Sequence, residues 1–122
     1  MTFLLLLLAL FSGLFSAGTT NDNSQTKARD TERKNDINSM YQKIEEHYND
    51  FGEYPTEREL VQQHDTKLPG LDPDALIDPY GDLIQSGEYS YTPSSCTAIG
   101  CEKYILSARL EDGSNYTKDS LN

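Results

Sequence analysis

Residues 27–56 decide the fold of this chain, and they read KARDTERKNDINSMYQKIEEHYNDFGEYPT. Apolar side chains recur in this stretch at spacings of three and four, which places them on one face of an α-helix. The predicted core face of the helix consists of Ile37, Met40, Tyr41, Ile44, Tyr48 and Phe51. Gly52 and Pro55 predict its end, because a glycine accepts the left-handed conformation after a last turn and a proline cannot continue the helix. The apolar face requires a second element to pack against.

Two segments before this face are weaker as helix. From Lys27 to Asn35 almost every residue is polar, so these turns are expected to project beyond the head as a neck. Residues 18–24, GTTNDNS, contain no strong helix former. Their low helix propensity predicts a break or an extended hinge.

Residues 1–17 are nearly all apolar and have two interpretations. As a helix they would be about 25 Å long, just short of the roughly 30 Å hydrocarbon core of a bilayer. As a secretory signal they lack a basic start, although cleavage after Gly18 is tolerable. Both interpretations direct the chain to a membrane or across it. The predicted organisation is a hydrophobic anchor or signal segment at 1–18, a hinge and amphipathic helix at 19–54, and a turn-rich connector with a sheet head at 55–122.

The head is predicted to be small and antiparallel. Thr56 and Glu59 have capping-box spacing, which favours a short helix to about His64. Turn signals follow at Pro69-Gly70, Asp72-Pro73 and Asp78-Pro79-Tyr80-Gly81. Strand candidates are Glu88–Thr92, Glu102–Leu110 and Asn115–Lys118, with a hairpin turn at Glu111–Ser114. A meander with one apolar face must be covered, so the fold class is α+β, a long N-terminal helix packed on a three-stranded antiparallel sheet in one domain.

Charge and motifs exclude several functions. The net charge is −10, and the excess of acid lies beyond Asn35. Nucleic acid is therefore not an expected partner, since phosphate binding requires a basic face; the acidity is interpreted as a solvated exterior, with an acidic binding surface as the alternative. No catalytic or phosphate-binding motif is present, and His47 and His64 are interpreted as surface or boundary residues. An enzyme is the least favoured class, and neither a cofactor nor a small-molecule substrate is expected.

The two cysteines, Cys96 and Cys101, are separated by four residues. A zinc site would need further ligands, and both histidines are far away in sequence. A local disulfide is the favoured interpretation; it would stabilise the head by about 2 kcal/mol and would require an oxidising location. A reduced pair in a cytosolic protein is the alternative.

The connector is rich in aspartate. Asp72, Asp74, Asp78 and Asp82 supply oxygen ligands on a turn-rich segment, which is the chemistry that Ca²⁺ prefers. The EF-hand spacing is absent, and aspartate beside proline or in a turn is also ordinary turn chemistry. The four residues are therefore a candidate calcium site with a competing structural interpretation.

These segments resemble bacterial type IV pilin-like proteins and the major pseudopilins of type II secretion. Ala28–Asp36 matches an A-R-D-x-x-R-K-x-D run, and Tyr48–Pro55 matches a Y-N-x-x-G-x-Y-P signature at the end of the helix. Leu76–Gly81 is similar to an L-x-D-P-W-G connector, and Tyr89-Ser90-Tyr91 falls where the first strand is expected. The paired cysteines and the hairpin after Tyr104 also resemble the family's head.

The resemblance implies a non-enzymatic subunit that is anchored by its N-terminal helix and packs with like subunits through that helix. Its head would be extracytoplasmic, either at the membrane or in a cell-surface filament, and the family's calcium region lies near Asp78 and Asp82. Family members carry a basic leader and a Gly before Phe-Thr-Leu-Ile-Glu, whereas Thr2–Leu5 here contains neither that Gly nor the Glu. We expect either that the natural start lies upstream or that the chain is never processed or polymerised. The rival interpretation is a secreted or anchored binding module that uses the Tyr-rich sheet or the acidic loop without forming filaments.

Overall fold

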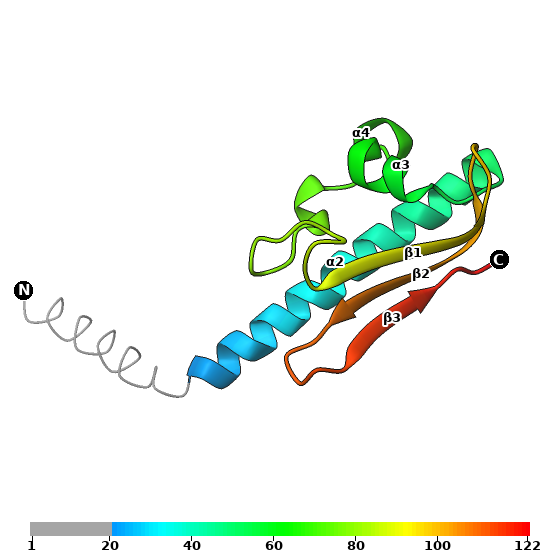
Figure 1. Cartoon of the computed structure of the whole chain (residues 1–122). Coiled ribbons are helices and arrows are strands. Elements are labelled where there is room, and N and C mark those ends of the chain that lie inside the picture. The colour runs from blue at the N-terminus through cyan, green and yellow to red at the C-terminus, as the bar shows by residue number, and fades with distance from the viewer. Residues whose placement is uncertain (1–20) are drawn as a thin grey trace, which may run out of the picture.

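The structure is a computed structural model that describes residues 21–122, with side chains from residue 23 onward. The predicted anchor or signal segment, residues 1–18, and its membrane contact through residues 1–17 lie outside the described residues. The first described element is α2, Asn21–Phe51, a helix of 31 residues that runs the length of the head (Figure 1). Within the part of the chain that is described, no helix has the length and apolar character needed to span a bilayer.

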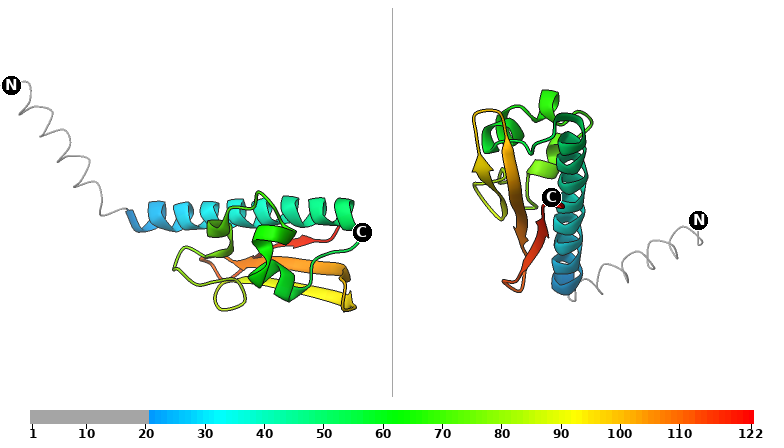
Figure 2. Two further views of the ribbon diagram at one scale, coloured as in Figure 1. Left: turned by 90° about the horizontal axis from the view of Figure 1, so that it is seen from above. Right: turned by 90° about the vertical axis from the view of Figure 1, so that its right-hand side faces the viewer.

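The head consists of short helices followed by a sheet. After α2 come α3 (Glu57–Gln62), α4 (His64–Lys67) and the 3₁₀ helix η2 (Pro73–Leu76). The strands are β1 (Tyr89–Cys96), β2 (Cys101–Arg109) and β3 (Asn115–Asp119). They form one antiparallel sheet in the order β1-β2-β3, and Figure 2 shows this sheet along one side of α2. The predicted α+β architecture of a long helix on a three-stranded antiparallel sheet is confirmed.

Local sequence signals explain most of the element boundaries. Thr56 and Glu59 form the predicted capping box at the start of α3, and Asp72 caps η2 ahead of Pro73. The hairpin turn closes where it was predicted, since the amide of Leu110 donates to the carbonyl of Ser114 at 2.8 Å. The first strand is longer than predicted and continues to Cys96, because it remains paired with β2 up to the Cys96–Cys101 position.

The core lies between α2 and the inner face of the sheet. Ile37, Met40 and Ile44 of α2 are fully buried, and Tyr41 and Tyr48 pack against the core while partly exposed. The sheet and connector contribute buried residues that include Leu60, Leu76, Ile84, Tyr89, Tyr91, Tyr104, Leu106 and Ala108. Five of the six predicted core-face residues therefore contact the core.

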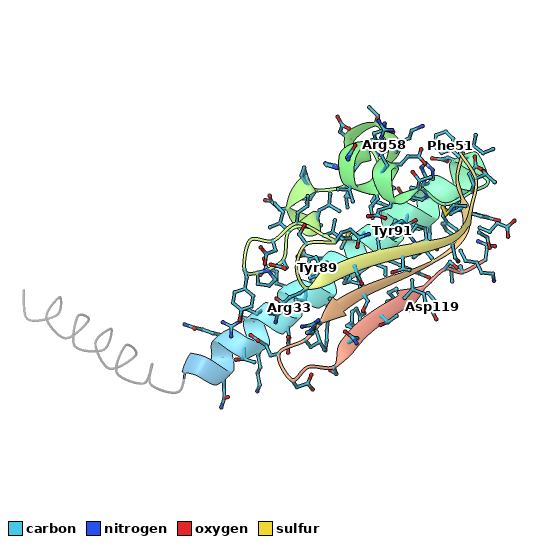
Figure 3. The ribbon with its side chains drawn as sticks, viewed as in Figure 1. Arg33, Phe51, Arg58, Tyr89, Tyr91 and Asp119 are labelled. Carbon is cyan, nitrogen blue, oxygen red and sulfur yellow. A yellow bond between two sulfur atoms is a disulfide. The ribbon has the colours of Figure 1, made fainter. Side chains whose placement is uncertain are left out.

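The sixth, Phe51, was predicted wrongly. Its side chain is 57% exposed at the end of α2, where Figure 3 labels it. Its ring instead lies 4.6 Å from the ring of His47, centroid to centroid. His47, predicted as a surface or boundary residue, is instead buried, because Phe51 and α4 cover it. Its Nδ1 lies 2.9 Å from the carbonyl oxygen of Lys67.

The predicted break at residues 18–24 is wrong over its described part, because residues 21–24 belong to α2. Asn and Ser cost a helix only a few tenths of a kcal/mol each relative to Ala. Extending an existing helix by one turn avoids the unfavourable nucleation step. The long helix that follows therefore outweighs the local preference of these residues.

Candidate functional site

The first candidate site lies where the N-terminal half of α2 meets the head. We call it the Arg33 cluster. Its members are Arg29, Asp30, Arg33, Tyr80, Glu88 and Glu111. They come from α2, from the connector before β1 and from the β2–β3 turn, so the cluster joins three separate parts of the chain. The predicted projecting neck is therefore wrong: at Arg33 the helix is covered by the head.

Arg33 is the centre of this cluster and is fully buried. One terminal nitrogen, Nη1, donates to Asp30 at 2.8 Å, and Nη2 donates to Glu88 at 2.9 Å. Glu111 lies 3.6 Å from Nη1. Burial alone would lower the pKa of the guanidinium, but the hydrogen bonds to Glu88 and Asp30 and the charge of Glu111 outweigh it and hold the pKa above its ordinary value. The guanidinium therefore stays charged inside the protein.

A second arginine and an aromatic ring complete the cluster. Arg29 is also paired with Glu111, and Asp30 accepts the backbone N–H of Glu111 at 3.1 Å. The guanidinium carbons of Arg29 and Arg33 lie 5.5 and 5.7 Å from the ring centroid of Tyr80, within cation–π range. The two cations thus face three carboxylates and a ring, which makes the cluster a closed structural junction.

Sequence reasoning missed this role, although a signal was present. Arg29 and Arg33 are four residues apart, so they lie on the same helical face. Both belong to the A-R-D-x-x-R-K-x-D run quoted above. Charge on a helix normally indicates a solvated face, and only the tertiary partners Glu88 and Glu111 reveal the burial.

Next to this junction is a partly buried carboxylate, Asp36. The hydroxyl of Tyr89 donates to it at 2.7 Å. Burial raises the pKa of Asp36 to about 6; the Tyr89 hydrogen bond opposes this shift, and the negative charges of Glu32, Asp72 and Asp74 add to it. The Asp36 carboxyl is thus set to titrate within about one pH unit of neutrality.

The predicted calcium residues have separate structural roles. Asp78 is buried and accepts the backbone N–H groups of Tyr80, Asp82 and Glu88 at 2.9–3.0 Å. Asp72 accepts the amide of Asp74 as the cap of η2. A Cβ on Gly87 would collide with the carboxylate of Asp78, which explains the glycine there.

Among residues 21–122, no group of three or more His, Cys, Asp or Glu side chains is arranged to hold a metal ion. The four aspartates are therefore not brought together as a calcium site. The physical reason is that Asp78, the central candidate, already uses both carboxylate oxygens for backbone hydrogen bonds that shape the connector.

A second polar cluster lies at the other end of the sheet, around Glu45. Its two carboxylate oxygens accept the hydroxyls of Tyr54 at 2.9 Å and Tyr104 at 2.6 Å. The amide of Asn122 donates to the Tyr54 hydroxyl at 3.2 Å. Tyr54 also pairs with Cys101 through two backbone hydrogen bonds of 2.8 and 2.9 Å. Tyr54, in the signature at the end of the helix, thus attaches α2 to β2.

The predicted disulfide between Cys96 and Cys101 is present. Beside it lies an open hollow of about 520 Å³ between the end of α2 and the β1–β2 loop. Ile99, on the rim of this hollow, is 72% exposed. Because both cysteines are bonded to each other, the chain offers no thiol nucleophile here. The hollow is a candidate binding surface.

Comparisons with known proteins add nothing to this description of the sites. No family model matches the chain, and neither a curated protein nor a solved structure matches it. The functional argument therefore rests on the residues and on their geometry.

Proposed function

We propose that this chain is a pilin-like, membrane-anchored structural subunit of a type IV pilus or a type II secretion pseudopilus, and not an enzyme. The observation that supports this most is the way in which one helix carries the whole head. The connector and the β2–β3 turn attach to α2 at Arg33, and β2 attaches through Tyr104 to Glu45. A head attached at both ends moves with its helix as one body, which is what a filament subunit held by its helix requires.

In this proposal like subunits contact one another through the N-terminal helix, and residues 1–17 enter the membrane. The head is extracytoplasmic, where an oxidising environment maintains the Cys96–Cys101 bond. The pilin-like fold is part of the same proposal. It is supported by the order of long helix, connector and antiparallel sheet, together with the helix-end signature at Tyr48–Pro55.

A second candidate function is a secreted or anchored binding module that does not polymerise. The open hollow beside the disulfide favours it, because Ile99 offers exposed apolar surface there next to Glu53 and Lys103. The two functions differ in what happens to the N-terminus.

The deciding experiment is mass spectrometry of the mature N-terminus, combined with fractionation of the producing bacterium. An N-methylated first residue and recovery in the membrane support the pilin-like subunit. A chain that begins near Thr19 in the soluble extracytoplasmic fraction would identify a cleaved signal and overturn the anchor.

A matched pair of variants tests the anchor directly. Leu7→Arg places a charge in the apolar segment, at a cost of about 3 kcal/mol for a membrane span, and is expected to reduce membrane recovery. Gln25→Arg adds the same charge at an exposed position of α2 and is expected to leave recovery unchanged. Equal recovery of the two variants would contradict insertion of residues 1–17.

A further inference from the structure

The strand β1 lies at one edge of the sheet, since the order is β1-β2-β3. An edge strand carries N–H and C=O groups that a strand of another molecule can pair with. An open groove of about 860 Å³ lies between α3 and this strand, lined in part by Val61, Leu83 and Pro93. The edge is therefore within reach of a second chain.

The hydrogen-bond pattern identifies which residues of β1 face this edge. The amide of Arg109 donates to the carbonyl of Glu88 at 3.0 Å, so the backbone groups of residue 88 point toward β2. In an antiparallel pair this direction alternates along the strand. Tyr89, Tyr91 and Pro93 therefore direct their backbone groups away from β2.

One side chain occupies the centre of this edge. The amide nitrogen of the Gln85 side chain donates to the carbonyl of Tyr91 at 2.6 Å, and its amide oxygen accepts the N–H of Tyr91 at 2.9 Å. The backbone N–H of Gln85 donates to the carbonyl of Tyr89 at 2.8 Å. Gln85 thus makes with Tyr91 the same two hydrogen bonds that a neighbouring strand would make. Figure 3 labels Tyr89 and Tyr91 along β1.

The rest of this edge is closed in other ways. Pro93 has no N–H to offer, and prolines in sheets are tolerated at edges for this reason. Ser95 has φ +53°, in the left-handed region, which interrupts the extended backbone. Gln85 itself has φ +77°, a conformation that a residue with a side chain seldom adopts. This strained backbone supports a specific role for the residue.

We propose that Gln85 is an edge plug: its side chain closes β1 to strand addition by a second copy of this chain. The proposal does not depend on the proposed function. It implies that contacts between copies avoid this edge. Without the Gln85 side chain, the backbone N–H and C=O of Tyr91 would both lack a partner and could bond a strand of another copy. The incoming partner would then be the same edge of another copy.

Two variants separate the plug from simple destabilisation. Gln85→Ala and Gln85→Lys both remove the side-chain oxygen that accepts the N–H of Tyr91. The lysine also places a charge at the edge, which opposes strand pairing. Gln42→Ala, at an exposed position of α2, is the matched control. The full chains, purified in detergent, are compared by sedimentation velocity over a concentration series, and hydrogen exchange at low concentration follows the amide of Tyr91.

We expect faster exchange of the Tyr91 amide in both Gln85 variants, and self-association in Gln85→Ala alone, with about a twofold rise in mass toward a dimer. Equal association of the alanine and lysine variants would overturn the proposal, because loss of stability would then explain it. So would a Gln85→Ala chain that stays as monodisperse as the wild type. If both variants are unfolded by circular dichroism, Gln85 is a structural residue of the connector and the proposal is wrong.

Discussion

At the scale of single residues, Arg33 has the most unusual environment in the described chain. Burying a guanidinium is costly unless its charge is compensated and its donors are bonded. Asp30 and Glu88 bond it directly and Glu111 lies nearby, but its Nε has no hydrogen-bond partner. The contacts therefore depend on one another, and loss of the arginine would leave several carboxylates close together.

Arg33→Gln should for this reason lower the free energy of unfolding by about 3 kcal/mol. Arg58→Gln, which removes an exposed arginine of α3, should change it by less than about 0.5 kcal/mol. Thermal unfolding followed by circular dichroism compares the two. Similar midpoints for the two variants would show that the Arg33 cluster contributes little to stability.

Asp36 predicts a dependence of stability on pH. Its pKa of about 6 in the folded chain lies above the ordinary value of 3.8, so the folded state takes up a proton first as the pH falls. The contribution of Asp36 to stability is therefore fully present below about pH 4 and is lost as the pH rises through 6. The groups that face it are the Tyr89 hydroxyl and the carboxylates of Glu32, Asp72 and Asp74.

Asp36→Asn should accordingly stabilise the chain at pH 7.5 by about 1 kcal/mol, a value reduced from the full pKa shift because the carboxylate is partly solvated. The gain should disappear near pH 4. Asp50→Asn, at an exposed position of the same helix, is the control for loss of one charge. A gain that is the same at both pH values would refute the raised pKa.

At the scale of elements, the sequence predicts that α2 is a helix, but it does not predict which parts of the helix surface the head covers. Spacing alone placed Ile37, Met40 and Ile44 on the buried face, because the sheet covers one continuous stripe of the helix. Phe51 lies on the same stripe by spacing, but its ring is more than half exposed and contacts His47 and Lys67 rather than the core between helix and sheet. The polar turns around Arg33 are covered because the β2–β3 turn extends over them and places Glu111 beside Arg33.

Alanine substitutions along this stripe should reflect the difference in burial between Ile44 and Phe51. Ile44→Ala is expected to destabilise the chain by about 3 kcal/mol, because it leaves a cavity in the core. Phe51→Ala is expected to cost less than about 1 kcal/mol, because the ring is more than half exposed. Chemical denaturation at one pH measures both, and comparable losses would mean that Phe51 is packed more tightly than its contact with His47 indicates.

At the scale of the whole molecule, two polar clusters hold the head to α2 at two places, in addition to single hydrogen bonds such as that of Tyr89 to Asp36. The Arg33 cluster holds the β2–β3 turn and the connector, and the Glu45 cluster holds Tyr54 and Tyr104. The disulfide lies near the second place, since Cys101 pairs with Tyr54 through the backbone. Opening the disulfide should therefore loosen the end of the head near the hollow first.

The double variant Cys96→Ser, Cys101→Ser should lose about 2 kcal/mol of stability, as expected for a short closed loop. Reductant should lower the unfolding midpoint of the wild type toward that of the variant and leave the variant unchanged. Mass spectrometry after alkylation without reductant should show no added label on the wild type. Two added labels would mean that the purified chain is reduced.

The sequence by itself determined the α+β order, the end of α2 at Gly52, the cap of α3, the hairpin turn and the cysteine pair. Each of these depends on interactions within a few residues, and local chemistry expresses such interactions directly. The resemblance to pilins rests on the same local motifs, and it therefore supports a function that remains a proposal.

Only the tertiary structure decided that Arg33 is buried, that His47 is covered, that Phe51 is exposed and that Asp78 organises the connector. Gln85 belongs with them, because its partner Tyr91 is defined only once β1 has become an edge strand. In each case the environment of a side chain depends on how segments that are distant in sequence pack together. Periodicity and propensity describe which face of an element a residue occupies, whereas what covers that face depends on the packing of the whole chain.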